Sequence, residues 1–315
     1  MAYNNIVGRP DVAGIIPVEY SNELLDRTEK GSYCMRLGRR LRRMTTHERK
    51  MPVLSALSTA YFPGGDTGLV QTSEVNWENV DVVAEDLAVI VPVPKNVLSD
   101  ASIPLWAEIM PDMVEAAGQA VDLAVLHGTN KPATWPTAIV TAATAASHTV
   151  EQGSGADLYA ELLGAAGVWS KVETDGFAIT GAIAHLGMRG ALRGTRDGAT
   201  GLPIFNADPA QASRYTVDGV PVWFAENGSM LATYPLVVGD WRQLAYSMRQ
   251  DVSFDVFREG VITDSAGNIV YNLMQQRMAA IMLTMRLGFA VPNPAKRANT
   301  NKATRYPFAV LTDLS

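Results

Sequence analysis

Hydrophobic and polar residues alternate along residues 75–93, which predicts β-strands. Apolar side chains recur at every second position from Val75 to Trp77, and again from Leu87 to Val93. This period of two is typical of strands, and a Pro-Gly-rich loop at residues 63–68 lies ahead of it. We therefore expect an extended hairpin in this part of the chain. Two strands alone bury no hydrophobic face, so the hairpin needs a partner surface.

The same alternation returns near the end of the chain. Apolar residues alternate over residues 252–256, before a turn at residues 265–268, and again over residues 281–289. Long antiparallel strands fit this pattern better than a helix does. Residues 296–315 are more polar and predict a surface tail. The methionines of this region are expected to be core residues on the strands: Met274, Met278, Met282 and Met285.

A helical period replaces the alternation between the two β-rich regions. The polar side chains from Asp112 to Asp122 recur every three or four positions and form one stripe, while another face is apolar. We place the main helix at residues 112–127, with Pro111 at its first turn or at a kink.

Residues 131–240 mix helical and strand patterns and contain many glycines. A helix is expected at residues 157–169, and strands at residues 177–180 and 220–223, the second of them after the turn Asp218-Gly219. This region is expected to form one α/β lobe.

The first fifty residues contain few apolar side chains. Glycines and prolines interrupt residues 8–17, and a helical stretch expected from about Ser21 carries a basic run. Because these few apolar side chains cannot form a hydrophobic core, the arm should lie across another body, which could be a neighbouring subunit. The basic run consists of Arg36, Arg39, Arg40, Arg42, Arg43, Arg49 and Lys50.

Composition and charge exclude several classes of protein. With 47% hydrophobic and 18% charged residues among 315, the chain can bury a large core. A net charge of −6 argues against a dedicated DNA-binding protein, although the basic run could face DNA or pair with acidic residues of an adjacent subunit. The single cysteine, Cys34, can form no internal disulfide and supplies no zinc cluster. The first residues do not predict a signal peptide and the apolar runs are short, so we expect neither secretion nor a membrane span.

Short motifs with catalytic meaning lack the context that their chemistry requires. Asp66-Thr67-Gly68 matches the tripeptide of aspartic proteases, but it has no second copy and lies in the expected hairpin turn. The glycines at 187, 190 and 194 lack the spacing and the lysine of a phosphate loop. The histidines are scattered without metal-ligand spacing: His47, His127, His148 and His185. We therefore expect no catalytic residue, no metal and no cofactor.

Four groups of motifs follow one another in chain order. They are Ile16–Leu25 ahead of the basic run, Leu87–Pro94 with Leu98–Ala101, Asp175–Thr180 through Gly239–Trp241, and Gln276–Ala279 with Arg286–Val291. In this order, with a helix and a hairpin between them, they resemble the Hong Kong 97 family of tailed-phage major capsid proteins. The match covers most of the chain.

The resemblance implies an α+β fold with an N-arm, an E-loop, a peripheral domain with a long spine helix, and an axial domain. It implies a major capsid protein without enzymatic activity, which self-assembles into hexamers and pentamers and forms the icosahedral head shell around a double-stranded DNA genome. The implied boundaries are residues 1–50 for the N-arm, 51–94 for the E-loop, 95–130 and 241–295 for the peripheral domain, 131–240 for the axial domain, and 296–315 for a C-terminal tail.

The resemblance also implies contacts and partners. The partners are further copies of the chain, a scaffolding protein, a portal, a decoration protein and packaged DNA on the inner face, with no membrane; assembly takes place in the host cytoplasm. The E-loop residues expected between subunits are Tyr61, Phe62, Val75, Trp77 and Val80. The N-arm residues expected in contacts are Arg36, Arg39, Arg40, Arg42 and Arg43.

One departure from the family concerns covalent cross-links. Some members join an E-loop lysine to a neighbour's asparagine, but residues 51–94 contain no lysine, so we expect non-covalent reinforcement of the shell. No long coiled-coil-like extension precedes the arm, so a separate scaffolding protein is expected. The alternative is an encapsulin-type bacterial nanocompartment, which shares the fold but encloses cargo enzymes instead of DNA. A hydrolase is the third hypothesis, and it lacks a triad or a metal set.

Overall fold

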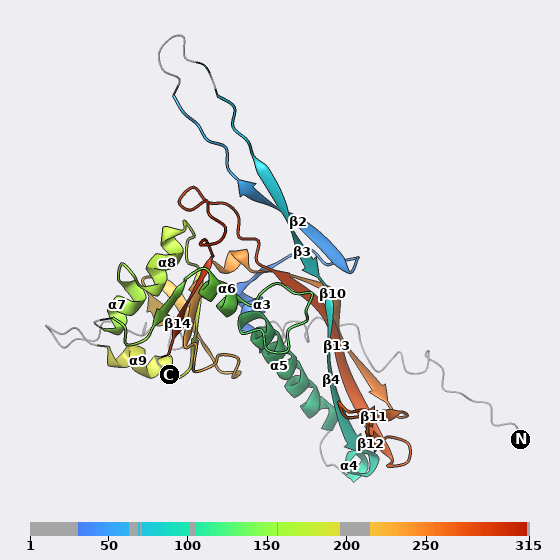
Figure 1. The fold of residues 1–315 in the computed structure, drawn as a ribbon. Helices are drawn as coiled ribbons and strands as arrows, with labels where there is room; N and C mark the ends of the chain where they lie inside the picture. Colours follow the sequence, from blue (N-terminus) through green and yellow to red (C-terminus); the bar gives the residue numbers. More distant parts are fainter. Residues whose placement is uncertain are drawn as a thin grey trace, which may run out of the picture. The chain divides into compact units, whose positions relative to one another are not determined.

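The computed structural model describes residues 31–62, 69, 71–100, 105–155, 157–195 and 215–313, and these residues form two compact units (Figure 1). Both units mix helices and strands, as the predicted α+β fold requires. Most of the expected arm and the loop with Asp66-Thr67-Gly68 lie outside the described residues. Of the described residues, unit 1 contains 31, 86–118 and 250–286, and unit 2 contains 32–85, 119–249 and 287–313.

Unit 2 is built on a mixed six-stranded sheet. Its strand order is β5 (Thr149–Glu151), β14 (Phe308–Thr312), β9 (Leu236–Gly239), β6 (Gly181–His185), β8 (Val220–Ala225) and β7 (Tyr215–Val217). Strand β14 lies between two neighbours, and its residues 308–311 are completely buried. The surface tail predicted for residues 296–315 is therefore wrong over this strand, because its short apolar run completes the sheet.

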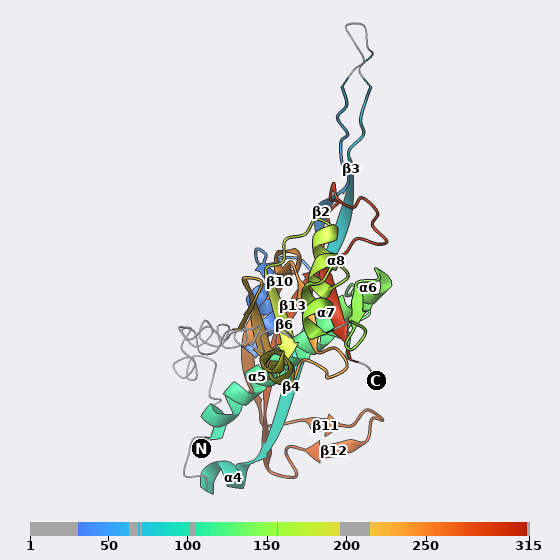
Figure 2. The same ribbon diagram turned by 90° about the vertical axis from the view of Figure 1, so that its left-hand side faces the viewer.

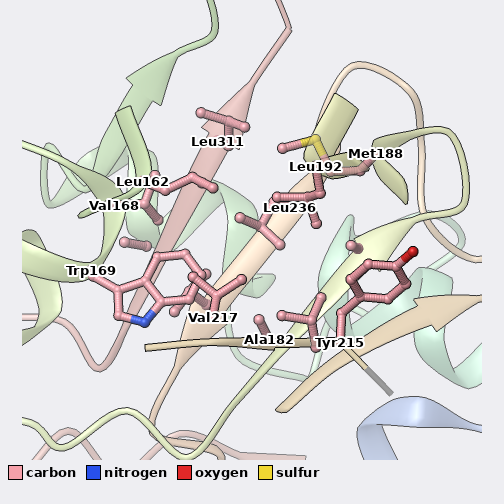
Figure 3. Packing of buried hydrophobic residues seen from close by; sticks show 14 of the residues in the cluster. Leu162, Val168, Trp169, Ala182, Met188, Leu192, Tyr215, Val217, Leu236 and Leu311 are labelled. Atoms are coloured by element: carbon pink, nitrogen blue, oxygen red, sulfur yellow. The ribbon is translucent and has the colours of Figure 1, made fainter. Parts of the chain in front are cut away.

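Short helices pack against this sheet and close its core (Figure 3). Trp169 and Leu162 project from two of these helices toward Leu236 and Leu311 of the sheet. The helices are α6 (Ile139–Ala145), α7 (Leu158–Leu163), α8 (Val168–Thr174) and α9 (Met188–Gly194).

Two of the elements predicted in this region have different bounds in the structure. The single helix predicted at 157–169 is two helices, because Gly164 ends α7 and Gly167 caps α8. The strand predicted at 177–180 begins at 181 instead. The turn at Asp218-Gly219 is confirmed, and both of its residues have positive φ, as a tight two-residue hairpin turn demands.

The predicted hairpin is formed by β2 (Glu48–Ala56) and β3 (Asn76–Val83), which pair antiparallel in unit 2. Both views show this ribbon extending beyond the six-stranded sheet (Figures 1 and 2). The hairpin ends earlier than the predicted residue 94, because β4 (Glu85–Pro94) joins a different sheet. The strand order of that sheet is β1 (Arg39–Arg40), β10 (Ala245–Phe257), β13 (Met278–Ala290) and β4. Apolar residues occupy even positions at Val80 and Val82 and odd positions from Leu87 to Val93, and the chain changes sheet between β3 and β4, where this phase changes.

The long strands predicted near the C-terminal end are confirmed. Every second residue of β13 from Ile281 to Phe289 is at most 1% exposed. Met274 contradicts the prediction of a core residue, since it lies in a turn and is 74% exposed. The elements of this region are η1 (Trp241–Gln243), β10 (Ala245–Phe257), β11 (Val261–Thr263), β12 (Ile269–Asn272) and β13 (Met278–Ala290).

The main helix is longer than predicted. Helix α5 spans Leu105–Leu126 and follows the short α4 (Lys95–Asp100), so the predicted start at residue 112 is wrong. Pro111 lies inside α5. A proline has no backbone N–H, so α5 lacks one of its internal hydrogen bonds at this position. Among the helices described, none is long and apolar enough to cross a membrane.

Candidate assembly surfaces

The hairpin exposes large apolar side chains near its outer end. Phe62 is 100% exposed, Trp77 67%, Val75 42% and Tyr61 38%. These four of the five predicted E-loop contact residues are therefore accessible in a single chain. The fifth, Val80, is half-buried and packs against a small buried cluster at the base of the hairpin, and its contact with a neighbouring subunit stays a prediction.

The base of the hairpin is fixed in unit 2. The indole Nε1 of Trp135 donates a hydrogen bond to the Val83 carbonyl oxygen at 3.1 Å. A side chain at Gly288 of β13 would clash with the same carbonyl, so the two backbones approach closely. The buried cluster at the base consists of Met44, Val82, Ala84 and Ala290. The hairpin is therefore anchored at one end and exposed at the other.

The basic run lies mostly outside helices. Helix α3 (Tyr33–Leu37) contains only Arg36, while Arg39 and Arg40 form β1, which pairs in parallel with β10. The predicted helix that carries the whole run is therefore wrong. Gly38 ends α3. A glycine fits this position because a Cβ here would lie only 2.6 Å from the Cys34 carbonyl oxygen.

The described part of the arm packs within its own unit. The Arg36 guanidinium lies 4.0 Å from the centre of the Trp223 ring, and Arg43 Nε donates to the Arg249 carbonyl at 3.2 Å. The Arg42 carbonyl accepts hydrogen bonds from other side chains of unit 2. The expectation that this arm finds its support outside the chain is wrong for residues 32–44. All five arginines predicted as arm contacts are nevertheless exposed in the single chain.

Helix α3 is held by the buried carboxylate of Asp122 on α5. Its Oδ1 accepts hydrogen bonds from Ser32 Oγ at 2.6 Å and from the Cys34 backbone N–H at 3.0 Å. Its Oδ2 accepts from the Tyr33 N–H at 2.9 Å and from Asn227 Nδ2 at 3.1 Å. Burial raises the pKa of Asp122, while these four donors act in the opposite direction. Helical spacing put Asp122 on a polar stripe, but spacing alone does not reveal donors that come from a segment about ninety residues away.

His148 belongs to a second buried polar group. The sequence pattern assigns no role to this residue, because the four histidines lack metal-ligand spacing. Its Nε2 lies 3.1 Å from Asp175 Oδ2, and its Nδ1 lies 3.1 Å from the Phe308 carbonyl oxygen. Burial lowers the pKa of His148, and Asp175 acts against this. The described residues contain no group of three or more His, Cys, Asp or Glu side chains that could hold a metal. The site is a structural clamp on the C-terminal strand.

Unit 1 carries an exposed apolar ribbon that sequence reasoning did not single out. Within the part of the chain that the structure describes, strands β11 and β12 pair only with each other, and Ile269, Val270 and Tyr271 are exposed in succession. The sequence signal for this surface is the run of three apolar residues at 269–271. Neighbouring residues of a strand point to opposite faces, so such a run places apolar side chains on both faces of the ribbon. The ribbon is a second exposed apolar surface, in addition to that of the hairpin.

Comparisons with known proteins agree with this arrangement. A model of the phage capsid family matches residues 13–296. A solved structure from Microbacterium phage Oxtober96 is 29% identical, with a TM-score of 0.77 over 98% of this chain and 100% of that one. One from Mycobacterium phage Cain is also 29% identical, with a TM-score of 0.77 over 98% and 99% of the two chains. The capsid of a native GTA particle is similar in fold, at 15% identity and a TM-score of 0.63 over both full chains. No curated protein gives a significant match.

Proposed function

Because this chain belongs to the phage capsid family, we propose that its copies join into hexamers and pentamers that close an icosahedral shell around double-stranded DNA. The protein is a major capsid protein of a tailed phage, has the Hong Kong 97 fold and forms the shell of the virion head by self-association. An encapsulin-type compartment is not favoured by these similarities. Assembly in the host cytoplasm is part of the proposal.

The exposed apolar surface of the hairpin is the observation that carries the proposal. Phe62, Val75 and Trp77 lie in water in the single chain, where a two-stranded ribbon gains little stability of its own. Burying one large apolar side chain stabilises a contact by about 1.5–3 kcal/mol. We infer that the hairpin is the E-loop and that it overlies an adjacent copy. Repetition by every subunit turns this modest contact into a stable particle.

The two units support a proposed division of labour in the shell. Unit 1 acts as the peripheral domain, which meets its neighbours at local threefold positions, and its apolar β11–β12 ribbon supports this role. The six-stranded sheet of unit 2 acts as the axial domain, which meets its neighbours at hexamer and pentamer centres. Helix α5 is the spine helix, and residues before 31 complete the N-arm.

Further partners in the proposal are a scaffolding protein, a portal, a decoration protein and packaged DNA. Exposure of Arg39, Arg40 and Arg42 supports contact with DNA phosphates on the inner face, and pairing with acidic residues of an adjacent copy is the alternative. Filter binding of duplex DNA by wild type and by an R39A/R40A/R42A variant distinguishes them. Salt-dependent binding that the variant loses supports the DNA contact, and equal binding by both supports the alternative.

Substitution of Trp77 tests the hairpin contact directly. W77D puts a charge into the proposed interface, so it should leave a folded subunit that forms no shells by electron microscopy. W77Y keeps an aromatic ring and should still assemble, which controls for the substitution itself. Circular dichroism of both unassembled variants should match wild type, because Trp77 is 67% exposed. Normal shells from W77D would exclude this role of the hairpin.

A further inference from the structure

A loop of unit 2 grips one strand of the hairpin. Residues 291–307, named the strap here, connect β13 to β14. The Ala295 backbone N–H donates a hydrogen bond to the Leu54 carbonyl oxygen at 2.8 Å. The Arg297 Nη1 donates to the Ser58 carbonyl oxygen at 3.0 Å. The strap therefore holds the first hairpin strand at two points four residues apart.

The strap also holds the second hairpin strand, close to a bulge. Lys302 Nζ lies 2.6 Å from each carboxylate oxygen of Glu78 on β3. The pairing register of β2 and β3 shifts between Leu54 and Ala56, which is the mark of a β-bulge. Bulges bend a strand and interrupt its ladder. The three strap contacts thus bracket the point at which the hairpin is most easily bent.

The strap itself is firmly built. The buried guanidinium of Arg305 donates to the Asn293 side-chain and backbone oxygens, both at 3.2 Å, and to the Asn299 carbonyl at 3.0 Å. Asn293 Nδ2 returns a hydrogen bond to the Arg305 carbonyl at 2.8 Å. The buried carboxylate of Asp175 accepts from Asn299 Nδ2 at 2.7 Å and from the Tyr306 N–H at 2.8 Å. A bend of the hairpin would therefore leave the strap in place.

The space between strap and hairpin is not filled. A cavity of about 200 Å³ lies between them, lined on one side by Val53 and Val80 and on the other by Val291, Pro292 and Tyr306. Protein interiors are normally packed as densely as organic crystals. The cavity gives the hairpin room to move against the strap.

We propose that the strap is a latch that fixes the direction of the hairpin. Glu78 pairs with Val53 on the base side of the bulge, and Ser58 lies beyond it. The Lys302–Glu78 ion pair and the Arg297 contact open together to let the hairpin pivot about the backbone bond from Ala295 to Leu54. The ion pair suits a reversible latch, because its side chains are 64% and 49% exposed and exposed pairs contribute little to stability. Use of the latch in a shell rests on the proposed function, since hexamers and pentamers present neighbours at different angles.

Charge reversal of the ion pair tests the latch in the unassembled protein. We would measure amide hydrogen exchange in β3 for wild type, K302E, E78K and the double variant K302E/E78K. Each single variant places like charges together and should speed exchange at residues 76–80 by about two- to five-fold. The double variant restores an opposite pair and should return exchange to the wild-type rate. The control K296E changes another strap lysine, which lies over the Phe177 ring, and should leave β3 unchanged.

The outcomes separate the latch from a merely structural strap. Wild-type exchange in both single variants, or fast exchange that the double variant fails to restore, would overturn the proposal. Faster exchange in β14 as well as β3 would also overturn it, because the strap would then be part of the global fold. None of these results depends on assembly, so failure of the proposed shell contact would be seen separately in the W77D experiment.

Discussion

Replacement of Asp122 by alanine should release α3 from the rest of unit 2. The substitution removes the acceptor of the Tyr33 and Cys34 backbone N–H groups, of Ser32 Oγ and of Asn227 Nδ2. Each buried donor left without a partner costs about 1–3 kcal/mol. Removal of a carboxylate that is unfavourably buried offsets part of this sum, so the net loss should be about 3 kcal/mol.

The single cysteine makes this loss measurable at one site. Cys34 is 2% exposed, and burial raises the pKa of its thiol, so an aromatic disulfide reagent should label the wild type slowly. If labelling proceeds through local opening, a loss of about 3 kcal/mol makes it roughly a hundred-fold faster in D122A. The control D81A removes an exposed aspartate and should label like the wild type. Labelling of D122A at the wild-type rate would refute the claim that this carboxylate holds the segment.

Three further results are expected. G288A should lower the stability of the fold by about 1–3 kcal/mol in thermal unfolding, because the new methyl group meets the Val83 carbonyl, whereas G190A has open space and should not. Burial puts the folded-state pKa of His148 below its ordinary 6.5, so the unfolded chain binds the proton first and the free energy of unfolding falls as the pH drops below about 6.5. The melting temperature of H148Q should therefore depend less on pH than that of the wild type. An unchanged slope would contradict this. Particles boiled in denaturant should run as monomers on a gel, since residues 51–94 contain no lysine, and a ladder of covalent oligomers would disprove the absence of cross-links.

The sequence predicted the elements that repeat a simple period over many residues. Strand β13 and the hairpin strands were found because alternation continues over long stretches. The same rule did not show that the chain leaves the hairpin at Ala84, because a period of two marks both β3 and β4 as strands without showing which sheet each one joins. Strand β14 was missed because the apolar run Phe308–Leu311 is too short to show a period.

Long-range partners were beyond what local patterns reveal. Four of the five predicted hairpin residues are exposed in the single chain, whereas Val80 has the opposite phase to Val75 and Trp77 along the strand and packs against the base cluster. The burial of Asp122 and His148 depends on donors and acceptors far away in the chain. The positive charge of the arm also does not reveal that the Arg36 guanidinium lies over the Trp223 indole of its own unit.

A cryo-electron microscopy structure of the assembled particle would show whether the hairpin packs against a neighbouring copy. The measurement is the solvent exposure of Phe62, Val75 and Trp77 in the shell, compared with their exposure in the single chain. All three side chains are expected to be buried against a neighbouring copy. A closed shell in which the hairpin touches no other subunit and these side chains remain in water would contradict this expectation.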